Sequence, residues 1–147
     1  VGYPTRQEER AILDRMISGV PPQAQQVVTL EDIRAARELV REVRLDDSLK
    51  EYLIRLVFAT REPENYHLES LRPLIAFGAS PRATIYLAQA AKAYALLHGR
   101  GYVIPDDIKA IALDVLRHRI IVTYEAEAEE VSPEAIVDRV LRSVEVP

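Results

Sequence analysis

Apolar side chains recur at helical spacing in six segments of this 147-residue chain, and no other feature constrains its fold as strongly. In residues 105–116 the apolar positions fall at i, i+3, i+4, i+7 and i+8, which places them on one face of a helix. Capping residues, capping boxes or prolines mark where such helices start. These signals predict helices that begin at or next to Thr5, Thr29, Asp46 or Asp47, Ser80, Pro105 and Ser132.

The segments between the predicted helices carry little strand pattern. Residues 120–124 (Ile-Ile-Val-Thr-Tyr) are the one convincing β-branched run, typical of a short strand. Residues 62–73 contain two prolines and are predicted as a loop, and residues 125–130, where acids and alanines alternate, as a solvated segment. We therefore predict an all-α fold, a bundle of about six helices with at most one short extended segment near residues 120–124.

The predicted helix over residues 81–98 is apolar nearly all round. Only Gln89 and Lys92 interrupt its apolar surface in the middle. Such a helix is typical of the buried centre of a bundle, and its alanines let neighbouring helices approach closely. The sequence therefore predicts that this helix is central, with Leu96 and Leu97 in the core.

Composition excludes several classes of protein. The chain has no cysteine, which removes disulfide scaffolds, thiol nucleophiles and zinc ribbons. Its net charge of −4 argues against a dedicated nucleic-acid binder. No apolar run approaches the roughly 18 residues of a membrane helix, and no secretory leader is expected within this sequence. We expect a cytoplasmic protein that uses neither nucleic acid nor a membrane as a partner.

The sequence offers no metal site and no hydrolytic centre. The three histidines, His67, His98 and His118, are far apart and lack the HExxH spacing of zinc enzymes. Asp106 and Asp107 lie in a helix first turn, where carboxylates favour the helix dipole. No GxxxxGK[ST] phosphate loop occurs in the chain. We therefore expect no metal ligands here and no ability of this chain alone to hold a triphosphate in that manner.

One short motif points to chemistry. In Gly78-Ala79-Ser80-Pro81-Arg82-Ala83 an arginine falls in the first turn of a helix, where the helix dipole disfavours a cation. Residues 70–105 contain four basic residues and no acid, so an anion would be tolerated nearby. Exposed helix amides together with a guanidinium favour phosphate binding. The alternative is an ordinary helix start with a solvent-exposed arginine.

Six short segments, in this order, carry a resemblance to a known family: residues 2–9 (GYPTRQEE), 77–83 (FGASPRA), 98–103 (HGRGYV), 105–108 (PDDI), 115–119 (VLRHR) and 124–126 (YEA). The whole chain resembles the C-terminal part of the MoxR family of AAA+ ATPases. One departure is Ile104, where members of the family often carry a Thr or Ser cap.

The resemblance implies specific roles. Its GASPR segment resembles the sensor-2 motif, so Arg82 would be the catalytic arginine that reaches the nucleotide γ-phosphate, and Ser80, Pro81 and Arg82 would form the nucleotide-binding residues. ATP and Mg²⁺ would be cofactors of the parent protein, because the Walker A, Walker B, sensor-1 and arginine-finger segments are not in this chain. The chain alone is therefore expected to be inactive.

The same resemblance implies an organisation and partners. Residues 1–19 would be the last helix of the AAA+ core, 20–28 a linker and 29–147 the helical lid. The partners would be the core of the same protein, neighbouring subunits of a hexameric ring and a von Willebrand factor A-type protein, with a chaperone-like role in assembling or activating complexes. The alternative is a stand-alone helical interaction module that works through the acidic segment from Glu125 onward, with Arg82 incidental.

Overall fold

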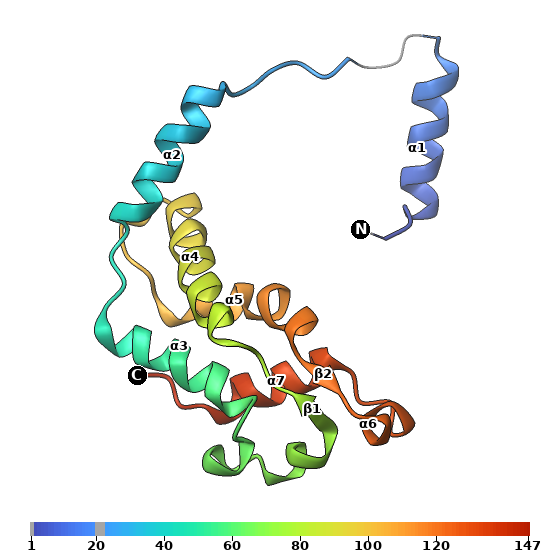
Figure 1. Cartoon of the computed structure of the whole chain (residues 1–147). Coiled ribbons are helices and arrows are strands. Elements are labelled where there is room, and N and C mark those ends of the chain that lie inside the picture. The colour runs from blue at the N-terminus through green and yellow to red at the C-terminus, as the bar shows by residue number, and fades with distance from the viewer. Residues whose placement is uncertain (1, 20–22) are drawn as a thin grey trace. The chain divides into compact units, whose positions relative to one another are not determined.

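A computed structural model describes residues 2–19 and 23–147. The part of the predicted linker at residues 20–22 lies outside the described residues. The elements in chain order are α1 (Arg6–Ile17), α2 (Leu30–Glu42), α3 (Asp47–Ala59), η1 (Pro63–Tyr66), η2 (Glu69–Leu74), β1 (Ile75–Phe77), α4 (Pro81–Leu97), α5 (Pro105–Leu116), η3 (Arg117–Arg119), β2 (Ile121–Val122), α6 (Tyr124–Ala128) and α7 (Pro133–Ser143), where η denotes a 3-10 helix (Figure 1). The chain forms two units, one up to Ile33 and one from Arg34 to Pro147.

The first unit contains α1, which begins with the predicted capping box. The Thr5 backbone N–H donates to the Glu8 carboxylate at 2.7 Å, and the Glu8 N–H donates to the Thr5 hydroxyl at 3.4 Å. None of the described residues of this unit is buried. The apolar stripe of α1 is exposed to between 49% and 72% at Ile12, Leu13, Met16 and Ile17. An apolar face of this kind is suited to packing against further protein.

Helix α2 also starts as the sequence predicts. The Asp32 carboxylate accepts the Thr29 N–H at 2.7 Å, and the Thr29 hydroxyl accepts the Asp32 N–H at 3.1 Å, which satisfies two amides of the first turn. The C-terminal end of the helix is tied to α4, because the Lys92 ammonium donates to the Arg41 carbonyl at 2.7 Å.

The second unit is an all-α bundle, as predicted. Helix α4 packs against α5 and α3, and α5 packs against α7 (Figure 1). The core runs from Val43 to Val144 along the chain. Helix α4 contributes one row of small and branched side chains at four-residue spacing, all fully buried: Ala83, Leu87, Ala91 and Ala95. Three alanines in this row keep side-chain bulk low where the neighbouring helices approach α4.

The expectation that α4 is buried nearly all round is wrong. Its opposite face is exposed, to 56% at Ile85, 44% at Tyr86 and 84% at Leu97, while Leu96 is half-buried. Leu97 lies at the last position of the helix, beyond the row that contacts α3 and α5. Hydrophobicity alone does not identify the buried face, because three alanines and one leucine fill it while larger apolar residues such as Ile85 and Leu97 are exposed.

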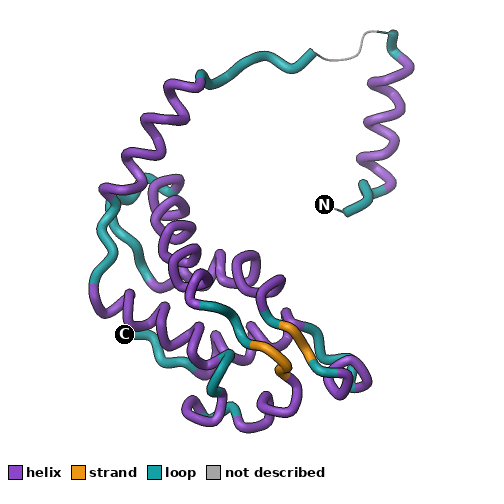
Figure 2. Tube along the Cα trace, in the orientation of Figure 1, coloured by secondary structure: helices purple, strands orange, loops and turns teal. Residues whose placement is uncertain are grey.

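A small antiparallel sheet joins β1 to β2, with Ile75 opposite Val122 and Phe77 opposite Ile121 (Figure 2). Strand β2 lies in the predicted extended segment, whereas β1 was not predicted. The predicted loop over residues 62–73 contains the two 3-10 helices η1 and η2. The segment 125–130, predicted as solvated, contains most of α6 and buries Ala126.

None of the helices formed by the described residues has the length and the apolar character that a membrane crossing requires.

Candidate functional site

The motif that the sequence singled out begins with a glycine that tolerates no side chain. A Cβ on Gly78 would lie 2.3 Å from the carbonyl oxygen of Thr60 and 2.9 Å from the Cγ atom of Arg61. The first of these neighbours is backbone and cannot move aside. Gly78 is therefore required by a close approach of two chain segments, the end of α3 and the loop that leads from β1 into α4.

The next residue of the motif is held on both sides. Ala79 is fully buried, and its N–H donates to the Thr60 hydroxyl at 2.9 Å. That hydroxyl in turn donates to the Val57 carbonyl at 2.7 Å. The Arg61 Nε–H donates to the Ala79 carbonyl at 2.6 Å. The loop that enters α4 is thus fastened to the C-terminal end of α3 by hydrogen bonds in a largely dry environment, where such bonds resist breaking.

The three residues proposed to meet a nucleotide follow directly and are exposed. Ser80 occupies the N-cap position with extended backbone, although its side chain makes no capping hydrogen bond, and Pro81 occupies the first helical position. Arg82 comes next, and the first turn of α4 contains no acidic residue. Among the described residues, Arg82 has no hydrogen-bond or ion-pair partner. Its guanidinium is therefore available to an anion from outside this chain.

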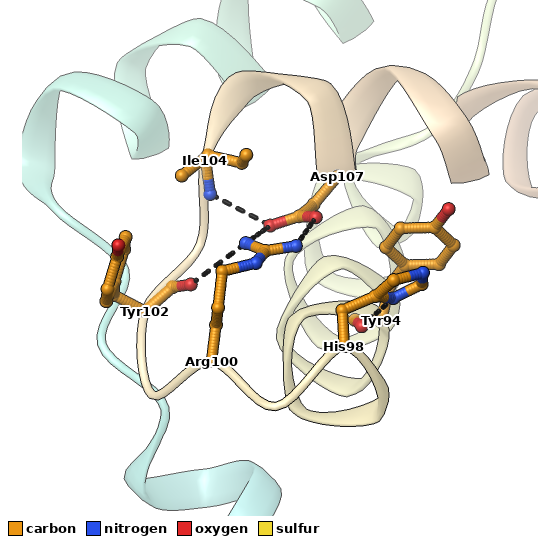
Figure 3. A network of polar contacts seen from close by, with 6 residues as sticks. All are labelled: Tyr94, His98, Arg100, Tyr102, Ile104 and Asp107. Carbon is orange, nitrogen blue, oxygen red and sulfur yellow. Dashed lines mark hydrogen bonds and ion pairs between the residues drawn. The ribbon is translucent and has the colours of Figure 1, made fainter.

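The other end of α4 holds an arginine in the opposite situation (Figure 3). Two Arg100 nitrogens donate to the two carboxylate oxygens of Asp107, at 2.5 and 2.6 Å. Asp107 is only 1% exposed, and it also accepts the backbone N–H of Ile104 at 2.9 Å. The hydrogen bonds from Arg100 lower the pKa of Asp107 below its ordinary value, against the opposing effect of burial.

This pair gives both residues roles that the sequence analysis did not assign. Asp107 lies in the first turn of α5, as predicted, and it is also buried and paired with an arginine. Arg100, although it belongs to the acid-free stretch, has this carboxylate as its partner. Asp107 also accepts the backbone N–H of Ile104, the N-cap residue of α5, which is the half of a capping box that the third helical residue supplies.

The loop between α4 and α5, which contains Arg100, is hydrogen-bonded to the segment that follows α2. The Arg44 N–H donates to the Gly101 carbonyl at 2.9 Å, and the Val103 N–H donates to the Arg44 carbonyl at 3.0 Å. Val43, beside this connection, is buried. The Arg100–Asp107 pair thus supports the place where the chain enters the bundle. Both residues lie in segments that carry the family resemblance, but nothing in the sequence indicated that they pair.

No group of three or more His, Asp or Glu side chains within residues 2–19 and 23–147 is arranged to hold a metal ion. The donor set at the start of α4 is likewise unsuited to a cation, since Ser80, Pro81 and Arg82 supply no carboxylate. These residues fit a phosphate group, which a guanidinium binds through paired hydrogen bonds.

Comparisons with known proteins agree with this fold. Residues 69–140 match the AAA lid domain family. The full chain is 45% identical to the "Chaperone MoxR1" of Mycobacterium tuberculosis and 40% identical to the "Uncharacterized protein YeaC" of Bacillus subtilis, covering 39% and 43% of those proteins. It superposes with a TM-score of 0.95, at 40% identity, on the crystal structure of a putative ATPase from Cytophaga hutchinsonii, covering all of this chain and 45% of that one.

The fold is that of a helical AAA lid domain. The chain belongs to the MoxR family of AAA+ ATPases. It spans about two fifths of the length of the curated relatives that it matches over its full length.

Proposed function

We propose that this chain is the sensor-2 lid of a MoxR-type ATPase, in which Arg82 contacts the terminal phosphate of ATP. The observation that carries the proposal is the contrast between the Arg82 side chain and the loop that precedes it. Arg82 is exposed and has no partner among the described residues, yet the loop before it is immobilised on α3. A guanidinium that is held in place but left unpaired is suited to bind an anion supplied by another part of the protein.

In this role the rest of the ATPase would supply the phosphate loop and the Mg²⁺ ligands. Arg82 would stabilise negative charge on the transferred phosphoryl group, and Ser80 and Pro81 would set the start of the helix that presents it. Because the residues before Arg82 are bonded to Thr60 and Arg61, contact with the γ-phosphate would pull on α3 and α4 together. Loss of that phosphate would then release the lid as one body.

The exposed stripe of α1 supports a boundary between core and lid. We propose that residues 1–19 are the last helix of the AAA+ core, that 20–28 link it to the lid and that 29–147 form the lid. The apolar side chains of α1 would then pack against the remainder of the core. A ring of subunits, a von Willebrand factor A-type partner, a cytoplasmic location and a chaperone-like role in assembling protein complexes complete the proposal.

The test is the ATPase activity of the full-length protein with Arg82→Ala. We expect turnover to fall by about 10³-fold, since arginines that stabilise such transition states contribute effects of this order. Binding of ATP should weaken far less. Arg82→Lys should restore little, because an ammonium cannot replace the planar, doubly donating guanidinium.

The matched control is Arg72→Ala, which removes an exposed arginine of the same acid-free stretch but outside the motif. It should leave turnover unchanged. Wild-type turnover in a correctly folded Arg82→Ala protein would refute the sensor role. That result would favour the alternative of an interaction module without a nucleotide role.

A further inference from the structure

A second arginine reaches the helix face that presents Arg82. The Arg119 guanidinium carbon lies 4.8 Å from the centroid of the Tyr86 ring, which is stacking distance for a cation and an aromatic ring. Tyr86 follows Arg82 by four residues on α4, so both side chains lie on the same face of the helix. Tyr86 is 44% exposed, which places the stack at the surface of the bundle.

The β1–β2 pairing explains why these distant residues meet. Phe77 lies opposite Ile121 in an antiparallel register. The ladder ends at this pair, so the chain that continues from Phe77 toward Arg82 and the chain that arrives at Ile121 from Arg119 meet at the same end of the sheet. The acidic residues of α6 follow β2 and leave from the other end of this ladder.

The polar groups of Arg119 are not satisfied within the described chain. Its Nε atom is buried and has no hydrogen-bond partner. It has no carboxylate partner among the described residues either, and the neighbouring Asp114 instead pairs with Arg117 at 3.2 Å. A guanidinium that stacks on a ring keeps its in-plane N–H groups free for an acceptor. Arg82 and Arg119 thus bring two guanidinium groups without a carboxylate partner among the described residues to the same face of α4, and a multiply charged anion would offset both charges.

We propose that Arg119, held by Tyr86, is a second phosphate-binding residue beside Arg82 and contacts the polyphosphate of the nucleotide in the ATPase. This inference rests on the proposed function, because it assigns the nucleotide to the surface that Arg82 marks. A polyphosphate matches two guanidinium groups better than a single carboxylate does, since it offers several charged oxygens along its length.

The test measures the affinity of the full-length ATPase for a non-hydrolysable ATP analogue in Arg119→Met and Arg119→Lys. Arg119→Met keeps an unbranched side chain on the Tyr86 ring but removes the charge. We expect its Kd to rise about 10- to 100-fold, the range for losing a hydrogen bond to a charged group. Arg119→Lys should recover part of the affinity, because it restores the charge. Arg117→Met is the control, and it should bind as the wild type does.

The melting temperatures of the Arg119 variants and the turnover of Arg82→Ala distinguish a failure of this inference from a failure of the proposed function. A Kd within twofold of wild type in Arg119→Met, with an unchanged melting temperature, would overturn the inference. So would equal weakening by Arg119→Met and Arg119→Lys accompanied by equal losses of melting temperature, which indicates a structural role only. If Arg119 behaves in this way while Arg82→Ala still abolishes turnover, the proposed function stands and only this inference fails. Wild-type turnover in Arg82→Ala refutes the proposed function itself.

Discussion

The two ends of α4 carry arginines that look alike in the sequence and differ in the structure. Arg82 and Arg100 both belong to the stretch 70–105 that contains no acid. Arg82 is exposed and without a partner among the described residues, whereas Arg100 forms a doubly hydrogen-bonded pair with the buried Asp107. This difference shows that an arginine in a stretch of sequence without acids can still have a carboxylate partner in the folded protein. Asp107 lies just beyond the stretch and returns to Arg100 through the turn between α4 and α5.

The largest expected effect is on the Arg100 end. Arg100→Ala should lower the free energy of unfolding more than any other change at either end of α4, because it leaves the Asp107 carboxylate buried without its cation. Asp107→Asn should cost less, since the side chain of Arg100 is 24% exposed and can reach water. Arg82→Ala is the comparison and should change stability by no more than about 0.5 kcal/mol. Urea unfolding measures all three, and equal midpoints would contradict the distinction between the two ends.

Within α4, the loss of stability caused by a leucine-to-alanine substitution should depend on whether the leucine lies on the buried face. Leu87→Ala should destabilise by about 2–5 kcal/mol, the usual cost of truncating a buried leucine. Leu97→Ala should remain within about 0.5 kcal/mol, because Leu97 is 84% exposed. Thermal unfolding of the two variants decides the point. A larger loss at Leu97 than at Leu87 would show that the buried face is assigned wrongly.

At the Arg82 end, the position of the loop that leads into α4 depends on Gly78. Gly78→Ala should destabilise by about 1–3 kcal/mol, the range for forcing an atom into a filled space. The added methyl group meets the Thr60 backbone and must displace the loop that leads to Arg82. In the full-length ATPase the same variant should reduce turnover more than the loss of stability explains. The exposed Gly101→Ala, which meets no neighbouring atom within 4 Å, is the matched control and should be nearly neutral.

The smallest effect distinguishes the two ends by pH. The pKa of Asp107 is lowered by Arg100, so its pairing contributes stability that is fully present above the ordinary carboxyl pKa near 3.8 and is lost as pH falls through the lower folded value. The wild type should therefore lose melting temperature below about pH 4 more steeply than Asp107→Asn does. Arg82→Ala should follow the wild-type curve. Identical acid profiles for wild type and Asp107→Asn would exclude a contribution from this pair.

Local signals in the sequence predicted most of the fold correctly. The caps at Thr29 and Ser132 form hydrogen bonds to amides three residues later, as their spacing indicates. The all-α class follows from periodicity of the same short range. Strand β1 was not predicted, because its pairing with β2 joins residues about 45 positions apart, such as Phe77 and Ile121. The assignment of Arg82 as a nucleotide contact stays a prediction.

The sequence by itself determined where six of the α-helices start, the all-α class and the motif from Gly78 to Arg82, because each depends on residues within about one helical turn of each other. Only the tertiary structure decided which face of α4 is buried, that Thr60 and Arg61 hold the loop before Arg82, and that Arg119 stacks on Tyr86. Those contacts join segments from different elements. Their formation depends on the path of the whole chain and on the packing that fixes it, which no local pattern of residues records.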